Sequence, residues 1–182
     1  MNIILFGPQG SGKGTQAQLL AEKFGYFYFE SGAYLRRVAE SNPELRKMLD
    51  SGILVPDIEM TSYLTAFFDE NALYDDIIFD GFPRTLEQYK FLKVWLTEKQ
   101  VKIDLGIVLE IGEDESIKRL SLRKREDDTP EAIKKRLELY HKRTEILIEE
   151  IQKDAKVIKI NGERSIEEIQ KDLVTIIENA KI

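Results

Sequence analysis

Short apolar runs alternate with longer segments of helical periodicity along the chain. Five runs are rich in β-branched and aromatic residues and have the length of buried strands; they cover residues 2–6, 26–29, 76–79, 105–111 and 157–160. The segments between them repeat apolar positions every three or four residues, which places those positions on one helical face. Strands separated by helices are typical of a parallel sheet covered on both faces, so the sequence predicts an α/β fold.

Local sequence signals mark the start of two helices, and one segment lacks the strand that the alternation of strands and helices would place there. Ser165 is suited to cap the last helix. Thr129-Pro130 is suited to begin another, whose predicted core stripe contains Ile133, Leu137, Tyr140 and Leu147. Residues 31–58 lack a strand and are predicted to form a small helical insertion, with two short helices and a turn at Ser51-Gly52.

Composition narrows the class of protein. A chain of 182 residues suits a single domain, and 42% hydrophobic with 33% charged residues indicates a folded protein. The net charge of -6 argues against general binding to nucleic acid or anionic membranes. The absence of cysteine and the single histidine exclude a disulfide framework, a thiolate nucleophile and Cys- or His-rich metal sites. With no signal-peptide pattern and no apolar run of membrane-spanning length, we expect a cytoplasmic protein.

A glycine-rich loop follows the first predicted strand and precedes an amphipathic segment, with the sequence Gly7-Pro8-Gln9-Gly10-Ser11-Gly12-Lys13-Gly14-Thr15. Glycines allow backbone amides to surround phosphates, the following helix adds partial positive charge, and Lys13 can reach the outer phosphates. We therefore predict an ATP-binding loop formed by Gly10, Ser11, Gly12, Lys13, Gly14 and Thr15. Thr15 is also a candidate magnesium ligand, although the generic pattern has its hydroxyl one position earlier.

A carboxylate ends the third predicted strand. Asp80 is followed by Gly81-Phe82-Pro83-Arg84-Thr85 and should lie at the crevice where open α/β sheets bind ligands. Such a carboxylate suits hydrated magnesium, so Asp80 is predicted to hold Mg²⁺ through water. The simpler alternative is that Asp80 only caps the turn before Gly81.

Two other nucleotide-binding classes fit the sequence less well. A dinucleotide-binding domain would use Glu30 for the ribose, but Thr15 stands where the third glycine of that fingerprint belongs. A regulatory GTPase normally needs an Asp-x-x-Gly switch and an Asn-Lys-x-Asp guanine reader. Neither motif occurs in the sequence.

Three motifs in order resemble the adenylate kinase family of nucleoside monophosphate kinases. They are the glycine-rich loop with Gln16, the segment Ser31-Gly32-x-x-Leu35-Arg36, and the segment from Asp80 to Thr85. The resemblance runs nearly end to end. It implies one kinase domain over residues 1–182, with a P-loop NTPase-like core, a five-stranded parallel sheet flanked by helices, and an AMP-binding insertion at 31–58. It also implies magnesium-dependent, reversible phosphoryl transfer from ATP to AMP, which gives two ADP.

The resemblance also assigns roles to individual residues. The AMP site would contain Ser31, Arg36, Val55, Gly81, Arg84 and Gln88, with Gln88 reading adenine. The catalytic cations would be Lys13, Arg84, Arg119, Arg123, Arg125 and Arg136, with Asp127 helping to orient them. ATP would additionally meet Arg119, Gly162 and Arg164.

The sequence departs from the family pattern at three places. Ala33 replaces a common acidic residue, Pro8-Gln9 replaces a small residue followed by proline, and only Lys124 separates Arg123 from Arg125. Because relatives carry a loop or a folded flap between those arginines, the lid at 123–126 is expected to be vestigial. Two other functions stay open, a kinase that accepts UMP or CMP and a nucleotide-binding regulatory module without turnover. The oligomeric state also stays open.

Overall fold

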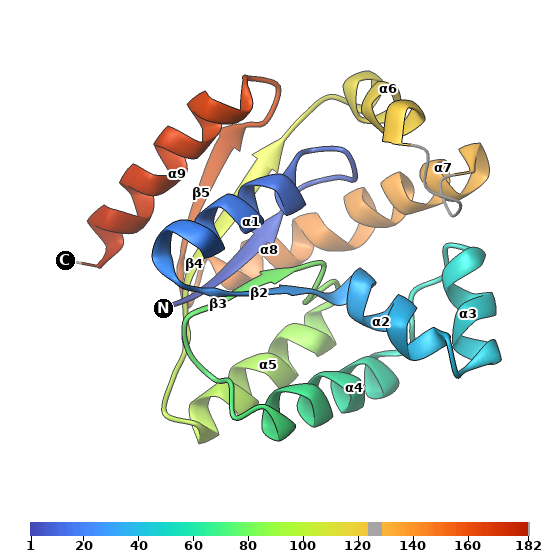
Figure 1. Cartoon of the computed structure of the whole chain (residues 1–182), viewed down its shortest axis with the longest axis horizontal. Helices are drawn as coiled ribbons and strands as arrows, with labels where there is room; N and C mark the ends of the chain where they lie inside the picture. The colour runs from blue at the N-terminus through green and yellow to red at the C-terminus, as the bar shows by residue number, and fades with distance from the viewer. Residues whose placement is uncertain (124–128, 182) are drawn as a thin grey trace.

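A fully parallel sheet of five strands forms the centre of the molecule in the computed structural model, which describes residues 1–123 and 129–181 (Figure 1). The strand order is β2-β3-β1-β4-β5. Its strands are β1 Asn2–Phe6, β2 Phe27–Glu30, β3 Ile77–Asp80, β4 Ile103–Glu110 and β5 Lys156–Asn161. The predicted α/β fold is confirmed, and each predicted strand is present within two residues of its expected bounds.

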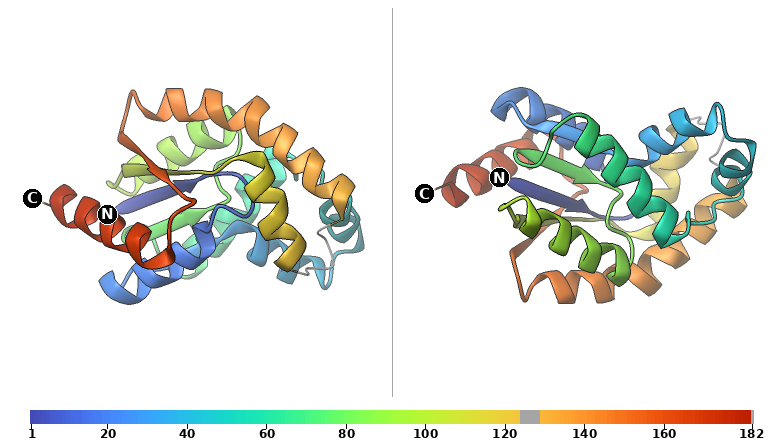
Figure 2. Two further views of the ribbon diagram at one scale, coloured as in Figure 1. Left: turned by 90° about the horizontal axis from the view of Figure 1, so that it is seen from above. Right: turned by 90° about the horizontal axis from the view of Figure 1, so that it is seen from below.

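Helices cover both faces of this sheet (Figure 2). The α-helices of the described residues are α1 Lys13–Phe24, α2 Ser31–Ala39, α3 Pro43–Asp50, α4 Asp57–Glu70, α5 Leu86–Glu98, α6 Glu113–Arg123, α7 Pro130–Leu139, α8 Glu145–Ile151 and α9 Ile166–Ala180. The two predicted helix starts are confirmed, because Thr129 accepts a hydrogen bond from the Ala132 amide and Ser165 forms a capping box with Glu168.

The strands are buried on both sides, which explains their continuous apolar sequences. On one face, Ile3 and Leu5 of β1 pack with side chains of α1 and α9, including Leu20 and Leu173. On the other face, Ile4 of β1 belongs to a larger apolar cluster formed with α4, α5 and α8. The two clusters hold the sheet in place from both faces. The loops at its carboxyl edge are therefore not needed to form the core and can bind a ligand.

The helix that begins at Pro130 differs from its prediction at one position. A π-helical turn, Tyr140–Thr144, lies between α7 and α8. Of the predicted core stripe, Ile133, Leu137 and Leu147 are buried. Tyr140 continues the helical backbone of α7, but it is only partly buried because it lines a cavity at that end of the helix.

Residues 31–58 contain no strand, as predicted, and their helices α2 and α3 extend beyond the sheet (Figure 1). The turn after α3 reaches α7. Lys135 Nζ lies 3.5 Å from the Ser51 carbonyl oxygen, and a Cβ built on Gly52 would lie 3.7 Å from Ala132 Cα. This segment therefore contacts α7 across the carboxyl edge of the sheet.

Among the described residues, no helix is both long and apolar enough to span a membrane.

A buried asparagine ties three strands together at the opposite edge of the sheet. The Asn2 side chain is 0% exposed. Its Nδ2 donates to the carbonyl oxygens of Tyr74 at 3.0 Å and Lys102 at 3.1 Å, and its Oδ1 accepts from the Ile77 amide at 3.1 Å. The side chain thus satisfies three backbone groups at the entrances to β3 and β4.

Replacing this side chain should leave those groups without partners. We expect Asn2→Ala to lower the free energy of unfolding by about 2–4 kcal/mol, measured by urea denaturation. Asn71→Ala is a matched control, because Asn71 is exposed and its amide donates to the Phe67 carbonyl of α4. A loss below about 1 kcal/mol in Asn2→Ala would contradict this role.

Candidate active site

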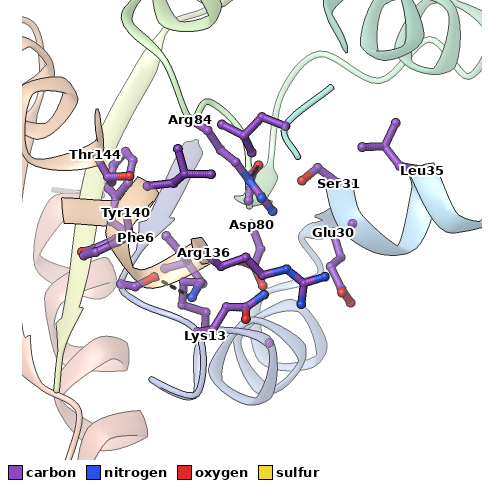
Figure 3. A pocket seen from close by; sticks show the side chains of 18 of the residues that line it. Phe6, Lys13, Glu30, Ser31, Leu35, Asp80, Arg84, Arg136, Tyr140 and Thr144 are labelled. Carbon is purple, nitrogen blue, oxygen red and sulfur yellow. Dashed lines mark hydrogen bonds between the residues drawn. The ribbon is translucent and has the colours of Figure 1, made fainter. Parts of the chain in front are cut away.

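A cavity of about 570 Å³ opens at the carboxyl ends of β1, β2 and β3. Its walls come from the glycine-rich loop, from residues 30–36 and 49–60, from Asp80 to Arg84, and from α6 and α7. Figure 3 shows Lys13, Arg84 and Arg136 directed into the space beside Asp80. The topology thus brings together segments that are far apart in the sequence at the edge where such sheets bind ligands.

The glycine-rich loop has the backbone that only glycine adopts easily. Gly7, Gly10 and Gly12 have φ angles of 143°, 81° and 92°. A Cβ on Gly7 would lie 2.5 Å from the Leu109 carbonyl oxygen, so a side chain is excluded there. Gly12 is the N-cap of α1 and has no side chain to occupy the first-turn amides. The positive end of α1 is therefore available to an anion in the cavity.

The Lys13 ammonium lies inside the curve of this loop. Its Nζ donates to the carbonyl oxygens of Gly7 at 2.8 Å and Pro8 at 2.9 Å. These bonds keep the ammonium beside the positive end of α1, where phosphate oxygens would also bind.

Asp80 is the most buried charged group of the site, at 8% exposure. Burial raises its pKa, and the neighbouring Glu30 carboxylate raises it further, whereas Lys13, Tyr28 and Arg84 act in the opposite direction. The Tyr28 hydroxyl donates to Asp80 Oδ2 at 3.1 Å and lies 3.4 Å from Glu30 Oε2. Burial and these two carboxylates raise the pKa of Tyr28, so Tyr28 stays a hydrogen-bond donor.

Tyr28 was not identified from the sequence. The available signal was its position two residues before Glu30, since residues two apart on a strand share a face. Glu30 pairs in register with Asp80 across β2 and β3, so the Tyr28 hydroxyl reaches both carboxylates.

Three guanidinium groups influence one another in the cavity. Burial lowers the pKa of Arg84, and the neighbouring Arg136 and Arg36 lower it further, against the opposite effect of Asp80 and Glu30. Arg84 Nε donates to the Gly81 carbonyl at 2.7 Å, and Arg36 Nη2 donates to Glu30 Oε1 at 3.0 Å. Mutual repulsion of this kind is relieved by a bound polyanion, and arginine pairs well with phosphate.

The residues predicted for the acceptor nucleotide form one wall of the cavity. They are Ser31, Arg36, Val55, Gly81, Arg84 and Gln88. Gly81 has a φ of 78°, and a Cβ there would lie 2.6 Å from Ser31 Oγ and 2.9 Å from Arg84 Nη2. Glycine at this position therefore lets Ser31 and Arg84 approach each other.

Most of the residues predicted for the donor nucleotide line a second cavity of about 270 Å³, whereas Lys13 and Gly14 line the larger one. The second cavity is lined by Gly10, Ser11, Gly12, Thr15, Gln16, Arg119, Gly162, Arg164, Ile166 and Ile169. Arg119 Nη1 donates to the Gly162 carbonyl at 2.9 Å and lies 3.4 Å from the Gly10 carbonyl. Its guanidinium thereby links the glycine-rich loop to the loop after β5.

The remaining predicted residues lie on α6, on α7 and in the connection between these helices. Arg119 and Arg123 are on α6, and Arg136 is on α7. The structure describes the backbone of Arg123 but not its side chain. Arg125, Asp127 and most of the predicted vestigial lid at 123–126 lie outside the described residues.

The carboxylates of the site suit a magnesium ion that arrives with a nucleotide. In the part of the chain that the structure describes, no three acidic or histidine side chains cluster in a way that could hold a metal. The larger cavity has the carboxylates Asp80 and Glu30 and the hydroxyl of Thr15. Because Mg²⁺ in phosphate chemistry keeps several waters and takes one or two carboxylates plus phosphate oxygens, these residues fit it.

Known proteins are similar in sequence to this chain over most of its length. The family described as adenylate kinase matches residues 5–156. The adenylate kinase of Bacteroides thetaiotaomicron is 39% identical over 169 residues, which cover 88% of this chain and 89% of that protein. The adenylate kinase of Mycolicibacterium smegmatis is 37% identical over 163 residues, covering 87% and 90%. That of Pyrococcus furiosus is 34% identical over 196 aligned positions, covering 88% of each.

The raised pKa of Asp80 predicts how stability depends on pH. A carboxyl group that binds its proton more tightly in the folded state destabilises the fold as the pH rises through its folded-state pKa. We therefore expect the nucleotide-free Asp80→Asn variant to have a higher free energy of unfolding than the unsubstituted protein at neutral pH. The gain should shrink as the pH falls to about 3, below the unfolded-state pKa of about 3.9, because the carboxyl is then protonated in both states.

Urea unfolding at several pH values measures this difference. Asp50→Asn removes an exposed carboxylate at the end of α3 and serves as the control. A neutral-pH stability of Asp80→Asn at or below that of the unsubstituted protein would show that ionised Asp80 is not under strain.

Proposed function

This chain belongs to the adenylate kinase family, whose members are nucleoside monophosphate kinases, and we propose that its reaction is reversible, magnesium-dependent phosphoryl transfer from ATP to AMP. The products are two ADP. One observation carries the proposal: Lys13, Arg84 and Arg136 share a cavity whose two ends are a phosphate-binding loop and a wall suited to a second nucleotide.

The donor site is proposed at the glycine-rich loop. The amides at the start of α1 and the Lys13 ammonium bind the phosphates of ATP. The base and ribose extend into the smaller cavity, between Arg119 and the loop that contains Gly162 and Arg164. The link that Arg119 makes between Gly10 and Gly162 supports this assignment, because it joins the phosphate end to the base end.

The acceptor site is proposed at residues 31–58 together with the segment after β3. Arg36 and Arg84 bind the phosphate of AMP, and Ser31 lies close enough to Arg84 to share that phosphate. Gly81 permits this approach. Val55 lies beside the base, and Gln88 reads it.

The chemistry requires positioning and positive charge rather than a protein nucleophile. A phosphate oxygen of AMP attacks the terminal phosphorus of ATP, and the bond from that phosphorus to the bridging oxygen of the leaving ADP breaks. Negative charge on the transferred group is met by cationic side chains, which we propose are Lys13, Arg84, Arg119, Arg123, Arg125 and Arg136, with Asp127 orienting the arginines.

Magnesium would be held by Asp80 through water and by Thr15, and when bound with ATP it supplies further neutralisation of phosphate charge. The hydrogen bond from Tyr28 fixes the Asp80 carboxylate that faces this position. Glu30 lines the same cavity, and its negative charge raises the pKa of Asp80.

Product analysis tests the proposed reaction. We expect two ADP for each ATP and AMP consumed with magnesium, and no ADP after magnesium is removed with a chelator. Lys13→Ala should lower kcat by about 10²–10³, because it removes a charge held at the phosphates. Lys23→Ala, an exposed change at the other end of α1, is the matched control.

The alternatives give distinct results in the same assay. A regulatory module would bind ATP and AMP without forming more ADP than Lys13→Ala does. A kinase for other acceptors would use UMP or CMP as efficiently as AMP. Either outcome would replace the present proposal.

The short connection between α6 and α7 predicts weak selection among donor bases. Residues 124–129 are all that separate these helices, which is too few for the folded flap of longer relatives. We expect kcat/KM for GTP, CTP and UTP to fall within about tenfold of that for ATP, with AMP held constant. Discrimination among acceptor bases should be larger. Strict selectivity for ATP would contradict this expectation.

A further inference from the structure

The Gln88 side-chain amide is held in one orientation by two different partners. Its Oε1 accepts from the Arg84 backbone amide at 2.8 Å, and its Nε2 donates to Asp57 Oδ1 at 2.8 Å. The Arg84 N–H can only donate, and the Asp57 carboxylate can only accept. Turning the Gln88 amide by half a rotation would set donor against donor and acceptor against acceptor, so the network itself excludes the flipped amide.

Asp57 is in turn held by a second hydrogen bond. The Thr85 hydroxyl donates to the same Oδ1 at 2.9 Å, while Thr85 Oγ1 caps α5 by accepting from the Gln88 amide at 3.2 Å. Asp57 is the first residue of α4, and Gln88 lies in the first turn of α5. Figure 1 shows these helices side by side. The carboxylate thus reaches from the end of the 31–58 segment to the residue that faces the base.

The fixed orientation has a consequence for the base. Gln88 is 3% exposed and lines the larger cavity. After its two protein bonds, its amide keeps one N–H and one acceptor site. Adenine presents a donor at position 6 beside a ring-nitrogen acceptor, whereas a 6-oxopurine presents an acceptor at position 6. One amide orientation pairs with adenine in both places, and the flipped orientation suits the 6-oxopurine.

We propose that Asp57 is a specificity-determining positioning residue, which locks the Gln88 amide in the orientation that reads adenine and rejects 6-oxopurines. This rests on the proposed function, in which Gln88 faces the acceptor base. Asp57 acts through Gln88 and does not touch the nucleotide. The lock differs from simple helix capping because it controls which monophosphate is preferred.

The test compares AMP with inosine monophosphate, which differs from AMP at position 6 and in the proton on N1. Asp57→Asn keeps the size of the side chain but offers either an oxygen or an amino group to Gln88, which weakens the lock. We expect the AMP-to-IMP ratio of kcat/KM to fall about five- to tenfold, through a higher KM for AMP and a lower KM for IMP. Glu59→Gln is the matched control, since it removes one exposed acidic charge from the same first turn of α4.

A double-substitution cycle separates positioning from a general structural role. Gln88→Met removes the reader, and in that background Asp57→Asn should change the AMP-to-IMP ratio less than twofold. Equal losses caused by Asp57→Asn in the two backgrounds would overturn the proposal. So would an unchanged ratio in Asp57→Asn alone, or in Gln88→Met alone.

Equilibrium titrations of AMP and IMP distinguish this inference from the proposed reaction. If both nucleotides bind and no ADP forms, the proposed function fails, and the ratio of Kd values still tests the role of Asp57. Should Asp57→Asn fail to fold, Asp57→Ser keeps a short polar side chain at the start of α4 and provides the same comparison. A preserved AMP-to-IMP ratio of Kd in the folded variant would overturn the proposal.

Discussion

Among the described residues, five cationic side chains line one cavity, and their mutual repulsion has to be offset by protein groups until phosphate binds. Lys13 donates to loop carbonyls, Arg36 to the Glu30 carboxylate, and Arg84 to the Gly81 carbonyl beside Asp80. Arg119 donates to the Gly162 carbonyl. The fifth, Arg136, enters from α7 and lowers the pKa of Arg84. Phosphate oxygens can replace these protein oxygens as hydrogen-bond acceptors. The cationic side chains can therefore change from protein partners to phosphate partners when a nucleotide binds.

The parallel sheet makes this concentration of charge possible. In register, Asp80 of β3 lies beside Glu30 of β2 and beside Leu5 of β1, whose strand leads into the glycine-rich loop. Apolar clusters on both faces hold these strand ends, so the packed sheet itself fixes the spacing between Glu30 and Asp80. This arrangement has a free-energy cost at two places. Ionised Asp80 is buried, and the glycines of the loop must adopt positive φ angles.

The sequence was informative where a property is local. Apolar runs, the caps at Ser165 and Thr129, and the glycine-rich loop each depend on neighbouring residues, and the structure agrees with all of them. Partners distant in sequence could not be predicted in this way. The bond from Tyr28 to Asp80 spans 52 positions, and that from Gln88 to Asp57 spans 31. The π-helical turn at Tyr140 was also missed, because no local residue pattern marks it.

The contact between the 31–58 segment and α7 links the two halves of the site. Ser51 and Gly52 lie against Lys135 and Ala132, which precede Arg136 on the same helix by one and four positions. A small apolar cluster of Leu120, Ile133 and Leu137 joins α7 to α6, which carries Arg119. The segment proposed to hold the acceptor therefore contacts α7, the helix that carries Arg136, and Arg136 is proposed to meet the transferred phosphoryl group. Any opening of that segment must break its contacts with α7, so access to the acceptor site and the placement of Arg136 depend on the same surface.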